Sequence, residues 1–128
     1  MALKDILPGK IGFGAAPLGN MFRDIPEVEA IATVEAAWNQ GIRYFDNAPL
    51  YGAGLAEIRM GEALVGKPRE DYVISTKVGR VILDEVDPDR TGEVFRHGRP
   101  NRVLRDYSAD ATLRSIEDSY REAEKLFI

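Results

Sequence analysis

The chain has 128 residues, 45% of them hydrophobic and 30% charged, which is typical of one soluble globular unit long enough to bury a core. Its formal net charge of −4 supplies no overall positive field, so we expect neither nucleic acid nor an anionic membrane surface as a partner. The sequence has no cysteine, which excludes disulfides, thiolate metal sites and a cysteine nucleophile, and we assign no residue to a metal.

The first apolar segment covers residues 11–19 and is interrupted by glycines. It predicts a buried strand whose end lets another backbone or a flat ligand approach, but a packed strand followed by a turn explains the residues at least as well. The spacing of Gly12, Gly14 and Gly19 is not that of a GxGxxG fingerprint. This argues against a small doubly wound nucleotide-binding domain.

A helix is predicted next. Asp24 and Glu27 have the spacing of a capping box, Pro26 suits the first turn, and Gly41 suits the end of the helix. The apolar residues at helical spacing, which we expect to pack on a sheet, are Val28, Ile31, Val34 and Trp38.

Two further strands each end in a charged side chain. Residues 42–52 form a β-branched and aromatic run that reaches Asp46 and continues into a Pro/Gly loop containing Tyr51. Residues 72–77 repeat the arrangement with Lys77 as the last residue. The order strand, helix, strand, helix, strand predicts right-handed crossovers and a parallel sheet, in which the loops after the strands carry the site.

Two more helices complete the pattern. The helix between these strands should end near Gly66 and Pro68, and its expected stripe is Leu55, Ile58, Glu62 and Val65, widened by Ala63 and Leu64. Asp110 is expected to cap the last helix, with a packed face of Leu113, Ile116, Tyr120, Ala123 and Phe127. We find no repeat or linker, so residues 1–128 are predicted to form a single unit.

Residues 78–108 are predicted to form a long loop. The loop contains six arginines: Arg80, Arg90, Arg96, Arg99, Arg102 and Arg105. They alternate with acidic residues, so a solvated mixed-charge surface is favoured over a phosphate site. Nothing local orients His97, the only histidine, and we expect it on the surface.

Asp46, Tyr51 and Lys77 form the candidate catalytic group. A phenol is a poor acid at neutral pH unless a nearby cation stabilises its ionised form, and Lys77 could supply that cation while Asp46 orients it. The alternative is that Asp46 and Lys77 make a structural ion pair while Tyr51 packs a loop, and spacing alone leaves both interpretations open.

Several linked motifs bear on this choice. The run Phe45-Asp46-Asn47-Ala48-Pro49-Leu50-Tyr51-Gly52, with Gly12-Phe13-Gly14 before it and Ser75-Thr76-Lys77-Val78-Gly79 after it, resembles the first three βα units of the aldo-keto reductases. The resemblance runs from about residue 10 to about residue 119. The long loop and its continuation into residues 115–119 are similar to a sugar-oxidising bacterial branch of that family.

This resemblance implies an α/β fold of the TIM (β/α)8 barrel type, of which about the first three βα units are present. It implies NAD or NADP as hydride carrier and a catalytic tetrad of Asp, Tyr, Lys and His, with Asp46, Tyr51 and Lys77 at the first three positions. Gly14, Ala15 and Ala16, together with Asp46, are the candidates for lining the nicotinamide. Asn47 stands where a small hydroxyl residue is more usual.

His97 does not match the tetrad position, and a fourth strand would follow the last helix, where the sequence ends. We therefore expect a truncated oxidoreductase that acts on an aldose or a pyridoxal-like carbonyl or alcohol and is weak or inactive as an isolated chain. The alternative is a non-catalytic assembly or interaction module. Uncovered sheet edges predict self-association or marginal stability. No signal-like start or long apolar run is present, so we expect a cytoplasmic protein.

Overall fold

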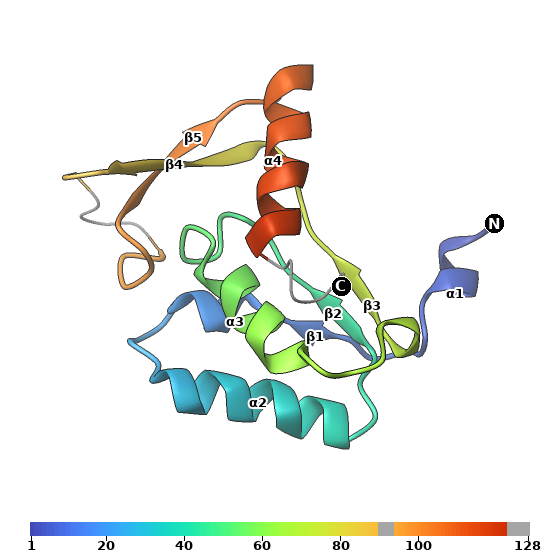
Figure 1. Ribbon diagram of the computed structural model, residues 1–128. Helices are drawn as coiled ribbons and strands as arrows, with labels where there is room; N and C mark the ends of the chain where they lie inside the picture. Colours follow the sequence, from blue (N-terminus) through green and yellow to red (C-terminus); the bar gives the residue numbers. More distant parts are fainter. Residues whose placement is uncertain (90–93, 123–128) are drawn as a thin grey trace.

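A three-stranded parallel sheet lies at the centre of the computed structural model, which describes residues 1–89 and 94–122. Its strands are β1 (Phe13–Gly14), β2 (Tyr44–Asp46) and β3 (Val73–Ser75), in the order β1-β2-β3 (Figure 1). Both neighbouring pairs are parallel, as predicted. The strands are shorter than the sequence runs suggest. In the first run, Pro17 lies in the 3-10 helix η1 (Ala16–Gly19), because a residue without an N–H suits the start of a helix better than a ladder.

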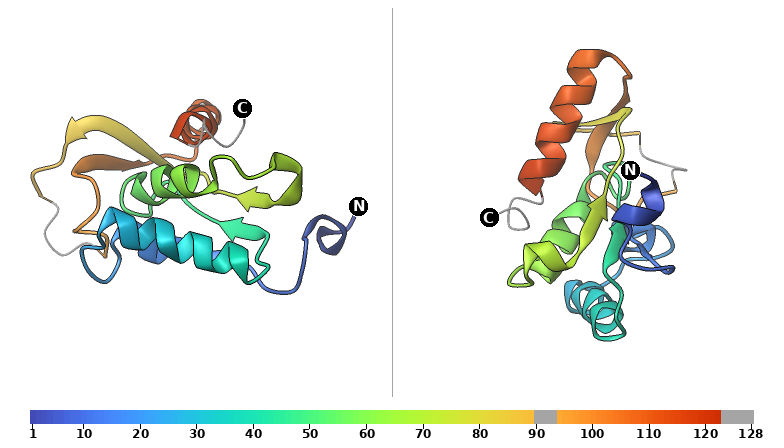
Figure 2. Two further views of the ribbon diagram at one scale, coloured as in Figure 1. Left: turned by 60° about the horizontal axis from the view of Figure 1, so that its bottom comes forward. Right: turned by 90° about the vertical axis from the view of Figure 1, so that its right-hand side faces the viewer.

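Helices α2 (Glu27–Asn39) and α3 (Leu55–Leu64) connect these strands and pack against each other (Figure 2). The core lies between them and the sheet, and Phe45 of the central strand is completely buried in it. The other buried members of this core are Ala15, Leu18, Ala30, Val34, Ala56, Met60, Ala63, Leu64 and Tyr72.

The start of α2 differs from the prediction. The helix begins after Pro26 and has no side-chain cap, so the expected capping box is wrong. Asp24 instead accepts a hydrogen bond from Asn20 Nδ2 (3.0 Å), and Glu27 accepts one from Arg59 Nε (2.9 Å). Both carboxylates bind side chains from outside the helix, which leaves neither for the first turn.

The buried faces of α2 and α3 agree with the prediction only in part. Ile31, Val34 and Trp38 pack on the core, as predicted. Val28 is exposed, and the fully buried residues of α2 are Ala30 and Val34. Of the stripe expected on α3, Glu62 and Val65 are exposed. The helices approach through small residues, and the buried apolar residues of α3 are Ala56, Met60, Ala63 and Leu64. The helix ends were predicted correctly: Gly41 and Gly66, just beyond them, have φ of +92° and +82°, a conformation that glycine adopts easily.

The segment expected to be a long loop forms an antiparallel pair of strands. Strands β4 (Arg80–Val86) and β5 (Asn101–Arg105) pair from Arg80 opposite Arg105 to Val86 opposite Asn101. The loop prediction is therefore wrong for these residues, although Arg90 lies outside the described part of the chain. His97 is exposed, as predicted.

Helix α4 (Ala109–Glu122) presents an unexpected face to the rest of the molecule. Leu113, Ile116 and Tyr120 are 63%, 50% and 51% exposed, so the predicted packed face is wrong for them. Ala123 and Phe127 lie outside the described residues. The buried residues are the small ones, Ala111, Ser115 and Ser119.

The predicted cap of α4 is also wrong. Ser108 Oγ, not the Asp110 carboxylate, accepts the hydrogen bond from the Ala111 N–H (3.2 Å). Asp110 lies within the first turn of the helix. The capping residue therefore lies two residues earlier than the sequence pattern indicates.

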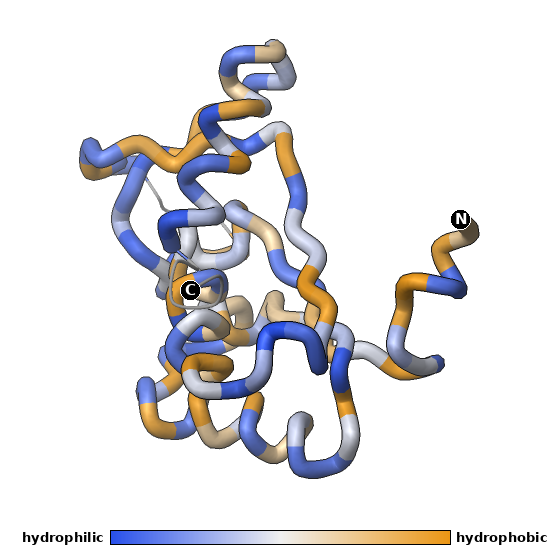
Figure 3. Tube along the Cα trace, turned by 45° about the vertical axis from the view of Figure 1, so that its right-hand side comes forward, coloured by the Kyte–Doolittle hydropathy of each residue, from blue (hydrophilic) through white to orange (hydrophobic). Residues whose placement is uncertain are grey.

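The remaining elements are short. The first helix, α1 (Leu3–Ile6), lies on an N-terminal arm that projects from the sheet and carries exposed hydrophobic residues (Figure 3). The 3-10 helix η2 (Arg69–Asp71) precedes β3. In the ranges 1–89 and 94–122, we find no helix with the length and apolar character needed to cross a membrane.

Candidate active site

The predicted group gathers at the carboxyl end of the central strand. Asp46 is the last residue of β2, and it lies in register with Gly14 on one side and Ser75 on the other. Its carbonyl oxygen accepts the Ala15 N–H (2.9 Å), and the next N–H, that of Asn47, donates to the Ser75 carbonyl (2.8 Å). The backbone of all three strands therefore determines where the Asp46 side chain lies.

Lys77 joins Asp46 from the segment after β3. Its Nζ donates to Asp46 Oδ2 (2.8 Å) and to the Asn47 carbonyl oxygen (2.7 Å). The same nitrogen lies 5.1 Å from the centroid of the Tyr51 ring. The structure thus brings together Asp46, Tyr51 and Lys77, although Lys77 lies two residues beyond the strand that was expected to end with it.

The surroundings of Lys77 favour its ammonium form. Partial burial lowers the pKa of Lys77, but the hydrogen bonds to Asp46 and Tyr51 and the attraction of both groups outweigh it, and the net pKa is raised. The Lys77 and Asp46 side chains are 47% and 36% exposed. An ion pair this accessible contributes roughly 0–1 kcal/mol to stability, so its importance is geometric.

A second support for Asp46 was missed in the sequence. Ser75 Oγ donates to Asp46 Oδ1 (2.5 Å), and Ser75 and Lys77 therefore bind different oxygens of the same carboxylate. Since the Ser75 proton is used in this bond, the Tyr44 hydroxyl must be the donor in its 2.9 Å contact with Ser75 Oγ. Alternation along β2 and β3 places Tyr44, Asp46 and Ser75 on one face, which is the signal that could have found them.

Asn47 holds the loop that follows β2. Its side chain is almost completely buried, its Nδ2 donates to the Ala56 carbonyl (3.1 Å), and its Oδ1 accepts the Ala48 N–H (2.9 Å). The amide therefore connects the start of the loop to the first turn of α3. The amide makes these two bonds from separate donor and acceptor atoms, whereas a hydroxyl side chain would have to make both from one oxygen.

The candidate nicotinamide residues differ in their surroundings. Gly14 is exposed, and a Cβ built on it would meet nothing within 4 Å. Ala16 is half-buried, whereas Ala15 is completely buried in the core. Gly14, in register with Asp46, therefore borders open space, whereas Ala15 belongs to the core.

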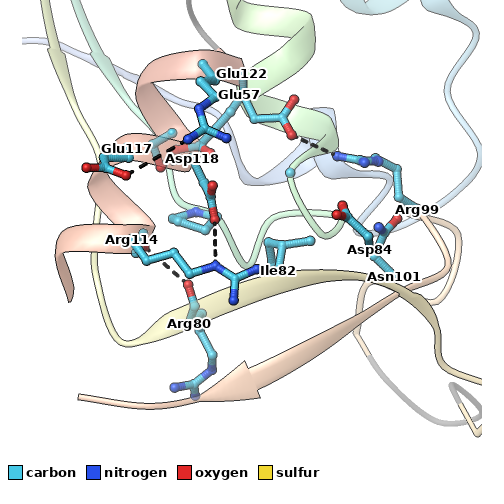
Figure 4. A pocket seen from close by; sticks show the side chains of 15 residues that line it. Glu57, Arg80, Ile82, Asp84, Arg99, Asn101, Arg114, Glu117, Asp118 and Glu122 are labelled. Carbon is cyan, nitrogen blue, oxygen red and sulfur yellow. Dashed lines mark hydrogen bonds and ion pairs between the residues drawn. The ribbon is translucent and has the colours of Figure 1, made fainter. Parts of the chain in front are cut away.

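A separate cavity of about 430 Å³ lies between α4, β4 and the start of α3 (Figure 4). Its walls carry paired charges, such as Arg99 with Glu122 (3.3 Å) and Arg114 with Asp118 (3.6 Å). None of Asp46, Tyr51 and Lys77 lines it. The cavity is therefore distinct from the candidate active site.

Glu57, at one wall of this cavity, is a buried carboxylate. Burial raises the pKa of Glu57, and hydrogen bonds from Thr76 Oγ1 (2.6 Å) and Ser119 Oγ (3.2 Å) oppose that rise only in part. Thr76 lies between the two residues that contact Asp46, and its side chain points the other way. Glu57 thus connects α3, α4 and the segment that carries Lys77.

The chain is similar to known proteins over most of its length. The sequence profile of the Aldo/keto reductase family matches residues 10–125. A D-threo-aldose 1-dehydrogenase from a Pseudomonas species is 54% identical over 72 residues, which are 56% of this chain and 22% of that protein. Pyridoxal 4-dehydrogenase from Microbacterium luteolum is 40% identical over 122 residues, which are 85% of this chain and 34% of that protein.

Solved structures give the same result. Glycerol dehydrogenase from Gluconobacter oxydans is 27% identical with a TM-score of 0.66, over 92% of this chain and 35% of that one. An aldo-keto reductase from Bacillus halodurans, solved in a holo form, is 30% identical with a TM-score of 0.63, over 89% of this chain and 32% of that one. The chain spans about a third of the length of these two structures.

These similarities confirm the expected α/β class and partial (β/α)8 barrel, to which the β4–β5 hairpin is an addition that the sequence did not predict. The family profile matches far more than half of the chain. This protein therefore belongs to the aldo/keto reductase family.

Proposed function

We propose that this chain supplies the first part of the active site of an NAD(P)-dependent oxidoreductase that interconverts a carbonyl and an alcohol. The observation that carries the proposal is the position of Lys77 Nζ, which binds Asp46 Oδ2 and the Asn47 carbonyl oxygen and also faces Tyr51. An ammonium held from two directions beside a phenol is the arrangement that proton transfer to a substrate oxygen requires.

Each residue has a distinct role in this proposal. Tyr51 exchanges a proton with the substrate oxygen through its hydroxyl. Lys77 stabilises the phenolate that forms when the proton leaves, and its raised pKa keeps it charged at neutral pH. Asp46 orients Lys77, and the Asp46 carboxylate is itself fixed by the hydroxyl of Ser75.

The residues present fit a nicotinamide nucleotide. The open surface at Gly14 lies in register with Asp46, so a flat ring could approach the site without meeting a side chain there. Gly14, Ala16 and Asp46 would border the ring, with Ala15 supporting them from the core. When bound, the nucleotide supplies or accepts the hydride. Membership of the aldo/keto reductase family supports this cofactor class without deciding between NAD and NADP.

The names of the relatives support a substrate class. The proteins named D-threo-aldose 1-dehydrogenase and pyridoxal 4-dehydrogenase share 54% and 40% identity with this chain over their matched regions. We propose an aldose or a pyridoxal-like carbonyl or alcohol as the substrate. Because members of a catalytic unit act together, three tetrad positions without a matching histidine should give trace turnover at most.

Cofactor titration tests the proposal. The wild-type chain should change the fluorescence of NADH or NADPH in a saturable manner. Gly14→Val, which fills the open surface, should weaken this binding, whereas Gly9→Val is a matched control, since a Cβ at Gly9 also meets nothing within 4 Å. A flat titration with both nucleotides would contradict the proposal.

The alternative is a non-catalytic assembly or interaction module. The observation that favours it is the outward apolar face of α4, where Leu113 and Ile116 are 63% and 50% exposed. An assembly module should leave NAD(P)H fluorescence unchanged at every protein concentration. The same titration therefore separates the two functions.

A further inference from the structure

We propose that the turn formed by residues 95–99, in the connection between β4 and β5, is the element that positions the Tyr51 phenol. This inference rests on the proposed function, because Tyr51 is its proposed proton donor and acceptor. The sequence indicates that the arginine-rich segment is a solvated surface. The role proposed for the turn gives part of that segment a function. Phe95 is the positioning residue, and Gly98 anchors the turn.

Tyr51 needs support from outside its own loop. Gly52, Ala53 and Gly54 all have positive φ, at 71°, 53° and 91°, so the loop follows no regular structure immediately after Tyr51. Tyr51 itself is held locally by backbone hydrogen bonds: its N–H donates to the Ala48 carbonyl (3.2 Å), and its carbonyl accepts the Ala56 N–H (3.1 Å). These bonds hold the backbone and do not fix the Tyr51 side-chain torsions, so the orientation of the ring depends on its packing neighbours, which include the core.

The turn is held directly against this loop. A Cβ at Gly98 would lie 2.4 Å from Gly52 Cα, and a Cβ at Gly52 would lie 2.5 Å from the Gly19 carbonyl oxygen. Three backbone segments that are distant in sequence therefore meet at Gly52, at separations that only glycine allows. The Arg99 N–H also donates to the Gly52 carbonyl oxygen (2.9 Å).

A second hydrogen bond fixes the same turn from the side of β1. Asn20 Nδ2 donates to the His97 carbonyl oxygen (2.8 Å), and Asn20 is 3% exposed. The turn is closed by its own Gly98 N–H to Phe95 carbonyl bond (2.8 Å). The His97 side chain is exposed and takes no part, so the contact depends on backbone position and not on the histidine ring.

Phe95 carries this anchoring to the phenol. Its side chain is 7% exposed, and its ring centroid lies 5.6 Å from that of Tyr51 at an interplanar angle of 36°. Ring pairs at this distance attract each other and restrict rotation. Besides the core, against which its ring packs, Tyr51 contacts Phe95 and lies 5.1 Å from Lys77 Nζ, so two neighbours from different segments help to orient the phenol.

The test uses an NMR signal that reports the Tyr51 ring in the complete chain. Lys77 faces that ring, so its ε-methylene protons should show an upfield ring-current shift in the wild type. In Phe95→Ala the freed ring should populate other rotamers, and the shift should fall by roughly half or more. Phe95→Tyr keeps a ring at this position and should retain the shift.

Two further variants complete the design. Gly98→Ala should reproduce the loss seen in Phe95→Ala, because its methyl group would displace the turn from Gly52. Phe22→Ala removes a phenylalanine that is 77% exposed and should leave the shift unchanged. Trp38, the only tryptophan, reports the fold of the α2 side by its fluorescence.

Each outcome decides the proposal. A Phe95→Ala chain with an intact Trp38 signal and an unchanged Lys77 shift would overturn it, and so would loss of the whole fold, because the turn would then be a general support. Cofactor binding is measured separately. A chain that shows the predicted shifts but binds no NAD(P)H would contradict the oxidoreductase function and leave the positioning role of Phe95 intact.

Discussion

Replacing Arg59 with methionine should strongly destabilise the protein. The Arg59 side chain is 6% exposed and makes four hydrogen bonds from α3: Nε to Glu27 Oε2 (2.9 Å), Nη1 to the Leu18 carbonyl (2.8 Å) and to Asn20 Oδ1 (2.8 Å), and Nη2 to the Ile25 carbonyl (2.7 Å). One guanidinium therefore holds the segment that leads from β1 into α2, including the residue that binds the 95–99 turn.

The expected loss of stability follows from the hydrogen-bond acceptors that Arg59 no longer binds in the variant. It fills much of the same volume but donates no hydrogen bond, so the Leu18 and Ile25 carbonyls lose their Arg59 donor at about 1–3 kcal/mol each. The Glu27 side chain is 51% exposed and can be solvated, so losing its bond adds roughly 0–1 kcal/mol. The total is about 2–7 kcal/mol, a large part of the roughly 5–15 kcal/mol that stabilises a typical domain.

Urea unfolding followed by Trp38 fluorescence measures this cost. With an m-value of about 1–3 kcal/mol/M, the transition midpoint of Arg59→Met should fall by about 2 M. Arg23→Met is the matched control: Arg23 pairs with Glu29 on the surface, and its loss should leave the midpoint close to that of the wild type. A free energy of unfolding for Arg59→Met within about 1 kcal/mol of the wild-type value would refute this stabilising role of Arg59.

Three further predictions concern other parts of the molecule. Burial raises the pKa of Glu57 above its ordinary value of 4.5, so between the two values the folded state binds more protons than the unfolded state and stability falls as pH rises. Glu57→Gln should remove this pH dependence, which is checked by measuring the free energy of unfolding from about pH 4 to about pH 8. A variant that keeps the wild-type slope would show that Glu57 is not its cause. Ser75→Ala should lower the free energy of unfolding in urea by about 0.5–1.5 kcal/mol, because the Asp46 carboxylate loses a hydrogen-bond donor. Ser75→Thr keeps the hydroxyl and should recover this stability. Equal losses in both variants would show that the hydroxyl is not responsible. Among the described strands, β1 and β3 each pair on one side only, so the isolated chain should self-associate or unfold at low denaturant concentration. A stable, cooperatively folding monomer in sedimentation would contradict this effect of the unpaired strand edges.

Local sequence was sufficient to predict that the side chains of Asp46 and Lys77 meet, whereas their catalytic assignment rests on the family resemblance. Asp46 and Lys77 follow neighbouring strands of a parallel sheet, and the carboxyl ends of such strands meet at one edge whatever the details of packing. The parallel order, the glycines that end two helices and the surface position of His97 were predicted for similar reasons. In each of these cases the determining interaction lies within a few residues or in the regular geometry of a βαβ unit.

The hairpin could not be predicted in this way. Residues 101–105 are a short, charged segment with no strong strand signal, and they become β5 only because β4 lies opposite. The favourable energy of such pairing comes from cross-strand contacts between residues that are distant in sequence. The same holds for the 95–99 turn, whose place against Gly52 depends on two glycines 46 residues apart meeting without side chains between them.

The sequence by itself determined which residues would lie at the carboxyl ends of the parallel strands and where two helices stop. Apolar spacing also identified Ile31, Val34 and Trp38 of α2 as facing the core. Only the tertiary structure decided which face of α4 is buried. On α4 the small Ser119 faces inward to reach the buried carboxylate of Glu57, while Leu113 faces outward. The physical reason is that a buried carboxylate must find hydrogen-bond donors, and this need, set by a different helix, outweighs the apolar periodicity of α4.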